Sequence, residues 1–498
     1  MKILSAEQIR AIDERTISEE GIFSYDLMER AANAFYEWFL INYPDQTLLI
    51  SVISGVGNNG GDGLIIAKLL KSVGYKVKVY IVEYSTRYSD DCIHNINRLI
   101  SENISFEKLT TQDSLPDFHD YDLLIDSIFG TGLNREPDGI AYDIIQKMND
   151  SDKPIISVDV PSGLFLEKKT TFAVRANETV TFQIPKLALF LPENYIFTGN
   201  VNIVSIGLSE KSIYETDTVL FYTTKKEISP LIKHLSKFAH KGTQGHALII
   251  GGSFGKCGSV CLAANSALRT GCGLVTVYVP MKCVSAIQSS FPEAMAIGDQ
   301  NEDFISNINF NIQPDAIGIG IGIGQHEKTQ KAFKGFLQTN DVPLVVDADG
   351  INILSQNLNW LKEVPPNSIL TPHPKELERL IGDWSDDFDK IDKSMKFAKK
   401  YKLIIVIKGA YSIILDGNNL YVNSSGTPAL ATAGSGDVLT GIITSLLAQG
   451  YSSINATRIG VYLHGLTASI TKNDIHPRSF IATDIIDNIG NAYFEIEK

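Results

Sequence analysis

Short apolar strands that lead into a glycine-rich loop and then a helix recur along this chain of 498 residues. The first example runs from a strand at 48–53 through the loop 55–63 to a helix expected from about 64 to 73. Alternating strands and helices produce a mostly parallel sheet with helices on both faces. Before residue 207 we expect helices within 5–42 and strands at 76–82, 121–128, 154–160, 179–182 and 201–206. A three-layer α/β domain is therefore predicted for the first part of the chain.

The same alternation starts again after a polar stretch at 208–236. A strand at 247–251, a glycine loop and a helix at 259–270 are followed by strands at 275–279, 344–347 and 403–407, and by a hairpin that turns at Asp416-Gly417. The two halves share an α/β pattern but no motifs. We therefore predict two different α/β domains, 1–220 and 221–498, each long enough to bury its own core.

Composition indicates a globular protein, with 44% hydrophobic and 20% charged residues. The net charge of −13 argues against a nucleic-acid-binding surface, which usually needs a basic patch. Acidic residues follow Met1 too soon for a signal peptide, and no apolar run approaches the roughly 20 residues that span a bilayer. The five cysteines include no C-x-x-C pair, so we expect free, mostly buried thiols and a cytoplasmic location.

Small residues between Gly426 and Gly441 lead into Gly434-Ser435-Gly436-Asp437, and an apolar helical pattern follows. Glycines at a helix N-terminus expose free N–H groups at the positive end of the helix dipole, which suits a phosphate. A carboxylate beside that anion site can take a proton from an attacking hydroxyl. The pattern is equally compatible with a simple helix cap, because Asp and Gly are common there.

Polar loops also follow three strands of the first domain: 55–63, 126–133 and 159–163. Ligands bind at the carboxyl ends of such strands, so these loops are expected to converge on one crevice, although a single Asp there is more often a turn former. In the second domain the repeated glycines of 315–324 predict a close backbone approach. Asp347 and Asp349 lie at the end of the strand that begins at 344; they fit a metal–phosphate complex or a helix cap, and capping is favoured for Asp349.

The Gly434-Ser435-Gly436-Asp437 stretch resembles the active-site signature of the ribokinase-like superfamily, whose Asp is the catalytic base. Lys241-Gly242, Thr371-Pro372-His373-Pro374-Lys375-Glu376 and Lys408-Gly409-Ala410 look like ADP-dependent NAD(P)H-hydrate dehydratases, and Asn58-Asn59-Gly60-Gly61-Asp62-Gly63 is similar to NAD(P)H-hydrate epimerases. The chain resembles the family of bifunctional NAD(P)H-hydrate repair enzymes over nearly its whole length. The resemblance implies a Rossmann-like epimerase domain at 1–220 and a ribokinase-like dehydratase domain at 221–498.

The resemblance also implies residue roles in the first domain. Asp159 is the expected acid/base for inverting C6 of the hydrated nicotinamide ring, and Asn59, Asp126 and Ser162 are the expected potassium ligands. The expected substrate contacts are Asn58, Asn59, Gly60, Gly61, Asp62, Gly130, Thr131, Gly132, Leu133, Asn134, Arg135 and Glu136. Lys186 could steady a phosphate or assist catalysis, and a surface lysine is an open alternative.

In the second domain the resemblance makes Asp437 the catalytic base and assigns Ser259, Gly324 and His373 to the hydrated dinucleotide. The adenine nucleotide is expected to contact Lys408, Gly409, Ala410, Tyr411, Ser412, Gly434, Ser435 and Gly436. Magnesium is expected as the counter-ion of the phosphates. The implied reactions are interconversion of the R and S hydrates of NADH and NADPH, and dehydration of the S hydrate with ADP, which yields NAD(P)H, AMP and phosphate.

Two rival interpretations stay open at this stage. A vitamin-precursor kinase would use the same glycine signature and stop after phosphorylation, although the additional first domain argues against it. The first domain could instead be a catalytically silent binding module, against which Asn59, Asp62, Asp126 and Asp159 argue. The sequence does not decide between ADP and ATP or between the two hydrates. We expect no nucleic-acid or membrane partner. We do expect the chain to form a homo-oligomer.

Overall fold

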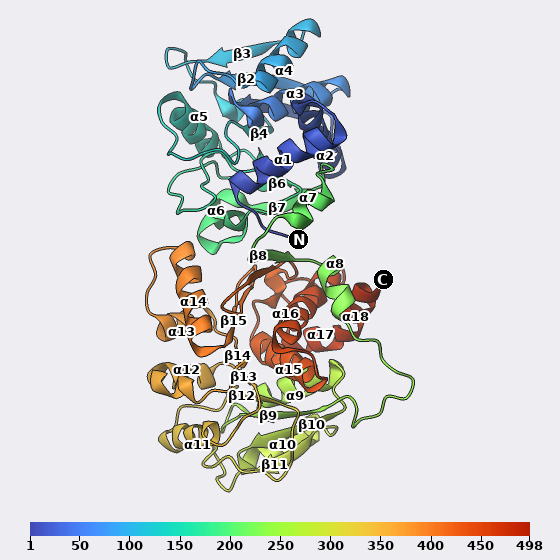
Figure 1. Cartoon of the computed structure of the whole chain (residues 1–498), viewed down its shortest axis with the longest axis vertical. Helices are drawn as coiled ribbons and strands as arrows, with labels where there is room; N and C mark the ends of the chain where they lie inside the picture. The colour runs from blue at the N-terminus through green and yellow to red at the C-terminus, as the bar shows by residue number, and fades with distance from the viewer. The chain divides into compact units, whose positions relative to one another are not determined.

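The computed structural model describes residues 1–498, which divide into two compact units. The N-terminal unit contains Lys2–Leu220 and Asp386–Phe388. The C-terminal unit contains Met1, Phe221–Ser385 and Asp389–Lys498. Each unit is built on a sheet of its own (Figure 1).

The N-terminal unit contains a seven-stranded sheet in the order β3-β2-β1-β4-β5-β6-β7. Every neighbouring pair is parallel, as the alternation of strands and helices predicted. The strands are β1 (Leu49–Ser54), β2 (Lys76–Val82), β3 (Phe106–Leu109), β4 (Leu123–Ser127), β5 (Ile155–Val158), β6 (Glu178–Phe182) and β7 (Asn200–Val204).

Helices cover both faces of this sheet. The side chains of α2, α3 and α4 pack with Ile50 and Val52 on one face, whereas α5 packs with Ile53 on the other, which follows the two-residue period of β1. The helices are α1 (Ala6–Glu20), α2 (Ser24–Asn42), α3 (Asn58–Ser72), α4 (Asp90–Ser101), α5 (Gly139–Asp150), α6 (Tyr195–Thr198) and α7 (Glu210–Glu215), with 3₁₀ turns η1 (Phe118–Asp120), η2 (Leu187–Phe190) and η3 (Pro192–Asn194).

The predicted start of α3 was wrong. The helix begins at Asn58 rather than near Leu64, so the Asn-Asn-Gly-Gly-Asp-Gly motif forms its first two turns. The reason is close packing: a Cβ on Gly60 would lie 2.0 Å from the Gly55 carbonyl oxygen, and one on Gly63 would lie 1.9 Å from Ser127 Oγ. The glycines therefore let a helix, rather than a loop, press against the ends of β1 and β4.

The C-terminal unit contains a ten-stranded sheet in the order β11-β10-β9-β12-β13-β14-β15-β16-β17-β8. The strands from β11 to β15 are parallel, and β15, β16 and β17 pair antiparallel around the predicted hairpin. The strands are β8 (Leu220–Thr223), β9 (His246–Ile250), β10 (Leu274–Val279), β11 (Met295–Gly298), β12 (Ala316–Ile319), β13 (Leu344–Val346), β14 (Ile369–Leu370), β15 (Ile404–Ile407), β16 (Ile413–Leu415) and β17 (Leu420–Asn423).

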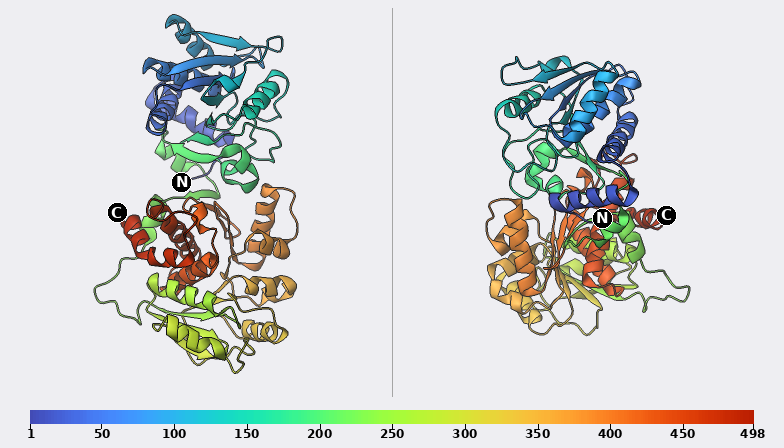
Figure 2. Two further views of the ribbon diagram at one scale, coloured as in Figure 1. Left: turned by 180° about the vertical axis from the view of Figure 1, so that it is seen from behind. Right: turned by 45° about the horizontal axis from the view of Figure 1, so that its top comes forward.

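Helices α11 to α14 lie on one face of the larger sheet, and α9, α10 and α15 to α18 lie on the other (Figure 2). The helices are α8 (Lys225–Ile228), α9 (Cys257–Arg269), α10 (Met281–Ser290), α11 (Glu327–Leu337), α12 (Asp349–Gln356), α13 (Pro374–Ile381), α14 (Asp387–Tyr401), α15 (Ser435–Ala448), α16 (Ser453–Ile470), α17 (Ala482–Asp487) and α18 (Ile489–Glu497), with 3₁₀ turns η4 (Ser229–Leu231), η5 (Leu358–Lys362) and η6 (Pro428–Leu430).

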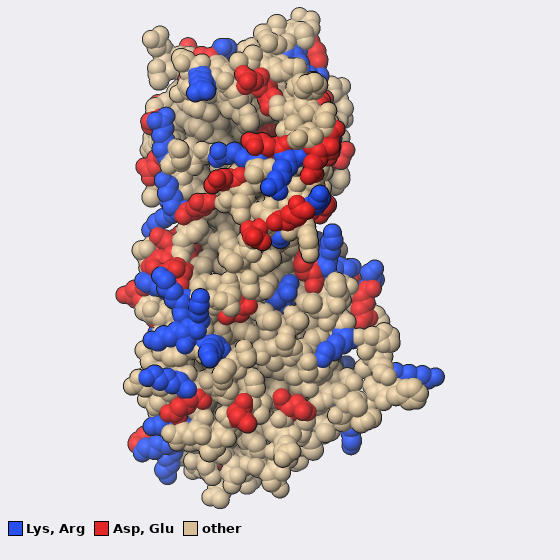
Figure 3. All heavy atoms as spheres, in the orientation of Figure 1, with Lys and Arg blue, Asp and Glu red and all other residues tan.

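Basic side chains gather on the surface over α13 and α14 (Figure 3). On α14 these lysines pair with acids one turn earlier, Lys393 with Asp389 and Lys396 with Asp392. The second pair is exposed and the first is half-buried, and ion pairs of this kind on a helix surface contribute little to stability. Every helix of the chain falls short of the length and apolarity that crossing a membrane requires.

The expectation that all cysteines are free was wrong. Cys257 and Cys283 form a disulfide, with their Cα atoms 5.5 Å apart, a spacing typical of disulfides. The first lies at the start of α9 and the second in α10, so the fold brings together residues that show no pairing signal in the sequence. Cys92 and Cys272 are free and buried, and Cys261 is free and half-buried.

Candidate active sites

The N-terminus of α3 is a potential anion site in the N-terminal unit. Gly57 precedes the helix, and no side chain caps the first amide groups. Free N–H groups at the positive end of a 15-residue helix favour a phosphate. The residues predicted to contact the substrate diphosphate, from Asn58 to Asp62, are the first five of this helix.

The three residues predicted to hold potassium are brought together beside α3. Asp126 is fully buried at the end of β4 and accepts hydrogen bonds from Ser162 Oγ at 2.5 Å and Ser162 N at 2.8 Å. Asn59 Nδ2 donates to the Phe129 carbonyl oxygen at 2.9 Å, and Ser162 Oγ lies 3.3 Å from the same oxygen. Burial raises the pKa of Asp126, although these hydrogen bonds oppose the rise.

Asp159 and Lys186 form a buried ion pair next to this cluster. Lys186 Nζ lies 2.6 Å from Asp159 Oδ1 and 2.8 Å from Thr181 Oγ1, and the lysine is only 1% exposed. Asp159 Oδ1 also accepts from Phe182 N at 3.0 Å, and its own backbone is left-handed with φ of 64°. The alternative that Lys186 is a surface lysine is therefore wrong. A strained residue that is held by several hydrogen bonds is typical of a functional site.

Asp13 was missed by the sequence analysis. It lies on α1 beside Ile9 and Ile12, which pack in one cluster with Ile184. Burial, with the nearby charge of Asp159, raises the pKa of Asp13 to about 7, and Lys186 opposes the rise. From sequence alone, one more acid on an amphipathic helix carries no signal.

Asp62 is a second carboxyl group near Asp159 whose pKa is shifted. It is 9% exposed, and burial together with the charges of Asp159 and Asp13 raises its pKa well above the ordinary value. Asp13, Asp62 and Asp159 therefore interact with one another, and Lys186 interacts with Asp13 and Asp159. Perturbed titrating groups of this kind, in a site with a free helix N-terminus, favour acid/base chemistry.

In the C-terminal unit Asp437 lies in the first turn of α15, directly after Ser435 and Gly436. Gly434 precedes the helix with φ of 83°, and a Cβ there would lie 2.5 Å from Leu262 Cδ1. Burial raises the pKa of Asp437 to about 6, a hydrogen bond from Ser259 opposes the rise and the charge of Asp347 adds to it. Such a carboxyl is ionised at neutral pH and is a stronger base than an exposed one.

Lys408 follows β15, and its side chain lies beside Asp347 and the first turn of α15. Its Nζ lies 2.8 Å from Asp347 Oδ1, and Thr440 Oγ1 of α15 donates to Asp347 Oδ2 at 3.0 Å. A Cβ on Gly436 would lie 3.4 Å from Asp347 Oδ2 and 3.5 Å from Lys408 Nζ. The turn that is expected to bind an anion, the expected nucleotide-binding lysine and Asp437 therefore lie together at the carboxyl ends of the strands.

His373 follows β14 and Gly324 lies in the loop after β12, and β13 lies between these two strands in the sheet. His373 caps α13: its Nδ1 accepts from Lys375 N at 3.1 Å, which leaves the ring proton on Nε2. Gly324 N donates to Asp349 Oδ2 at 3.0 Å, and Lys256 Nζ lies 3.3 Å from the same oxygen. The predicted capping role of Asp349 was therefore wrong, since Ala348 occupies the cap position and Asp349 instead holds the Gly324 loop.

A second missed residue lies beneath the anion-binding turn. His464 of α16 is buried, and its Nε2 lies 3.0 Å from the Ser435 carbonyl oxygen and 3.1 Å from Ser435 Oγ. Burial lowers its pKa to about 4, so the ring is neutral at physiological pH. His464 therefore packs against the turn at Ser435 and adds no charge to it.

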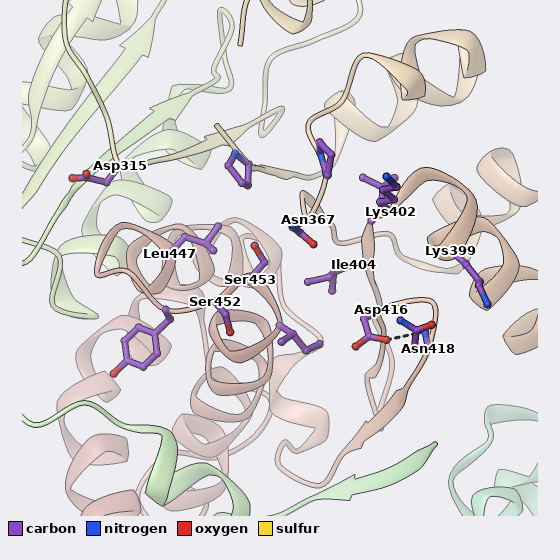
Figure 4. A pocket seen from close by; sticks show the side chains of 15 residues that line it. Asp315, Asn367, Lys399, Lys402, Ile404, Asp416, Asn418, Leu447, Ser452 and Ser453 are labelled. Atoms are coloured by element: carbon purple, nitrogen blue, oxygen red, sulfur yellow. Dashed lines mark hydrogen bonds between the residues drawn. The ribbon is translucent and has the colours of Figure 1, made fainter. Parts of the chain in front are cut away.

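A cavity of about 700 Å³ lies at the other end of this sheet (Figure 4). Its walls include Asp315, Asn367 and Lys402, which precede β12, β14 and β15. Ligands of α/β sheets bind at the carboxyl ends of strands, where Asp347, His373 and Lys408 lie. The cavity is therefore separate from the candidate site.

Comparison with known proteins agrees with this geometry. Residues 247–491 match the family described as NAD(P)H-hydrate dehydratase, and residues 24–188 match the family described as YjeF-related protein N-terminus. A bifunctional NAD(P)H-hydrate repair enzyme of Dictyoglomus turgidum is 33% identical, over 100% of this chain and 99% of that protein. The chain belongs to the family of bifunctional NAD(P)H-hydrate repair enzymes. The family prediction, and with it the expectation of a bifunctional enzyme, is confirmed.

Two further proteins extend the comparison. A bifunctional NAD(P)H-hydrate repair enzyme of Coxiella burnetii is 32% identical over 97% of both chains. A ribokinase-like superfamily protein from Enterococcus faecalis is 23% identical, with a TM-score of 0.50, and it covers 57% of this chain and 99% of its own. This likeness confirms the predicted ribokinase-like α/β fold.

Proposed function

We propose that this chain repairs hydrated NADH and NADPH in two steps, with residues 1–220 as the epimerase and residues 221–498 as the dehydratase. The observation that carries the proposal is the full-length relationship to bifunctional repair enzymes, together with the separate family matches of residues 24–188 and 247–491. The R and S hydrates interconvert at C6 in the first site. The S hydrate is dehydrated in the second site with an adenine nucleotide as phosphoryl donor.

Asp437 starts the second reaction as the general base. It takes the proton of the C6 hydroxyl, whose oxygen attacks the terminal phosphoryl group of ADP. The amides of Gly434, Ser435 and Gly436 and the Lys408 ammonium stabilise the developing negative charge. Phosphate then leaves C6 with electron donation from the ring nitrogen, and loss of a proton from C5 to water restores the C5–C6 double bond. The products are NAD(P)H, AMP and phosphate.

The raised pKa of Asp437 supports this role, because a base with a pKa of about 6 is both ionised and effective near pH 7. His373 would donate from Nε2 to the hydrated dinucleotide. The main chain at Ser412 and Gly409, held by hydrogen bonds of the Ser412 hydroxyl, would contact the adenine nucleotide.

In the first site one carboxyl group would act as the general acid and another as the general base. Asp13 holds a proton near pH 7 and gives it to the leaving C6 hydroxyl, so that water departs and C6 becomes planar. Asp159, which is paired with Lys186, takes a proton from the water that returns on the opposite face of the ring. A buried carboxyl with a raised pKa and a second carboxyl paired with a lysine lie in different environments, which suits separate acid and base roles.

The residues present fit the two expected ions. Asp126, Ser162 and the Phe129 carbonyl place oxygen atoms together, and Asn59, which donates from Nδ2 to that carbonyl, would supply its Oδ1; potassium there would neutralise charge beside the substrate diphosphate. Magnesium is usually held by one or two carboxylates together with substrate phosphates, and Asp347 is the carboxylate that fits this role. Cytoplasmic location and assembly into a homo-oligomer stay predictions.

The test is to incubate the pure S hydrate of NADH with ADP, magnesium and the protein. We expect NADH absorbance to recover with one AMP released per NADH. A phosphorylated hydrate that accumulates without NADH would instead indicate a kinase that stops after phosphoryl transfer, and the proposal would fail.

A further inference from the structure

The disulfide between Cys257 and Cys283 joins two elements at the edge of the proposed dehydratase site. Cys257 is the first residue of α9, and Cys283 lies in the first turn of α10. The Ser253 carbonyl oxygen lies 3.7 Å and 3.9 Å from their sulfur atoms. The bond therefore fixes the end of the glycine loop 252–256 against a second helix.

This loop supports residues of the site on both sides. Ser253 Oγ donates to the Gly322 carbonyl oxygen at 2.8 Å, and Lys256 pairs with Asp349, which holds Gly324 N. A Cβ on Gly322 would lie 2.8 Å from the Lys256 carbonyl oxygen, so the two loops are in close contact. A change at Cys257 would therefore be transmitted to the glycine loop that contains Gly324.

The first turn of α9, where Cys257 lies, also contacts the proposed catalytic carboxylate, Asp437. Ser259 lies two residues after Cys257 on α9 and hydrogen-bonds to Asp437. Helix α9 packs closely on α15, since a Cβ on Gly441 would lie 2.1 Å from the Ala263 carbonyl oxygen. The first turn of α9 is thus held in place on one side by α15 and on the other by the disulfide.

The chemistry of the pair favours reversible bond formation. Cys257 lies at a helix N-terminus with no acid in the first turn and Lys256 before it, which stabilises a thiolate. Cys257 is half-buried, whereas Cys283 is fully buried. An attacking thiolate therefore reaches the sulfur of Cys257 first, and Cys283 is the leaving group.

A purely structural disulfide is not needed here. Small extracellular domains depend on disulfides because their cores are small, but this unit has extensive hydrophobic clusters around α9, α15 and α16. Only two of the four cysteines between 257 and 283 are paired, so the bond is specific to the glycine loop and α10.

We propose that Cys257 and Cys283 form a reversible redox modification site that adjusts the dehydratase activity. Oxidation by a low-molecular-mass disulfide proceeds in two exchanges: the Cys257 thiolate forms a mixed disulfide and releases one thiol, and Cys283 then displaces the second thiol. A dithiol reductant reverses both steps and is itself oxidised to a cyclic disulfide. The bonded state holds the glycine loop and Ser259 in the geometry described, and the reduced state loosens them.

The test uses the full chain in both states. Alkylation under denaturing conditions and mass measurement should find three free thiols after treatment with oxidised glutathione and five after treatment with dithiothreitol. Dehydration of the S hydrate should fall several-fold on reduction and return on reoxidation, whereas epimerisation should stay constant. Cys257→Ser and Cys283→Ser should behave like the reduced protein in both conditions. Cys261→Ser, one turn further along α9, should respond like the unmodified chain.

The inference rests on the proposed dehydratase activity for its readout, but the thiol count is independent of that activity. Five free thiols after oxidation would overturn the site itself. A verified change from three to five free thiols with unchanged dehydration would overturn its regulatory role. Circular dichroism of the reduced protein should remain that of the folded chain, and a general loss of structure on reduction would show that the bond is only a structural link.

Discussion

Replacing Asp437 by Asn removes the charge of the proposed base and leaves the shape of the site unchanged. Asn keeps the size and can still accept the hydrogen bond from Ser259, but it cannot take a proton at neutral pH. General base catalysis contributes typically a hundred- to ten-thousand-fold, so dehydration of the S hydrate should fall by at least about a hundredfold. Nucleotide affinity, which depends on Lys408 and the helix N-terminus, should largely survive, and epimerisation should not change.

The same substitution should stabilise the fold near neutral pH. Burial raises the pKa of Asp437 from 3.8 to about 6, and each pKa unit corresponds to 1.36 kcal/mol, so ionisation in the folded state costs at most about 3 kcal/mol. Because the folded pKa lies above the unfolded one, the protonated carboxyl stabilises the fold below pH 4 or so, and this contribution is lost as the pH rises through about 6. Asn does not titrate, so its advantage should grow over that range and then stay constant.

The assay compares denaturant unfolding of the full chain and the variant at pH 4 and pH 7.5, alongside NADH recovery and nucleotide calorimetry. Glu327→Gln is a matched control, since Glu327 lies in the first turn of α11 but is exposed, and its pKa is lowered by Lys331 rather than raised. The control should show no stability gain at pH 7.5. Near-normal dehydration by Asp437→Asn, or a stability difference that is the same at both pH values, would refute the assignment of Asp437 as a buried catalytic base.

Three other predictions concern the first reaction and the division of the chain. Epimerisation should be faster in potassium than in sodium buffer, and Asp126→Ala should remove the difference; equal rates for the unmodified protein would exclude a potassium requirement. Lys186→Met should leave Asp159 buried without its cationic partner, which typically costs about 3–5 kcal/mol, and should slow epimerisation with dehydration unchanged; a variant as stable as the original chain would argue against the ion pair. Separate fragments 1–220 and 221–498 should epimerise and dehydrate respectively, and an insoluble or inactive fragment would show that the boundary is misplaced.

The parts of the fold that follow from local pattern could be predicted from the sequence. Buried strands such as β1 and β9 are continuous apolar runs, and the glycines after them mark sites where another backbone approaches closely. Asp437 was identified because the glycines before it and the apolar helix after it lie together in the chain. Asn59, Asp126 and Ser162 follow strands whose carboxyl ends must meet at one edge of a parallel sheet.

Features that depend on packing between distant segments could not be predicted. Asp13 and His464 are ordinary residues of amphipathic helices until the fold places them against Asp159 and Ser435. The burial of Lys186 depends on the turn after β6, which carries a lysine that looks solvent-exposed in sequence. The start of α3 was misjudged because glycine-rich segments usually form loops, and only the contacts of Gly60 with Gly55 show why a helix forms.

The pairing of Cys257 with Cys283 has the same origin. Twenty-six residues separate the two cysteines, and a strand lies between them in the sequence. Their proximity follows from the adjacent positions of α9 and α10 on one face of the sheet. Sequence spacing alone therefore favoured free thiols, and the three-dimensional fold reversed that expectation.

The central claim, that one chain carries both repair activities, is tested most directly with an equal mixture of R and S hydrates of NADH. The full chain is incubated with the mixture, ADP, magnesium and potassium, and both epimers are followed by chromatography while NADH absorbance is recorded. We expect both epimers to disappear and NADH to be recovered completely, since epimerisation supplies the S form to the dehydratase. Recovery that stops near one half, with the R hydrate left unchanged, would contradict it.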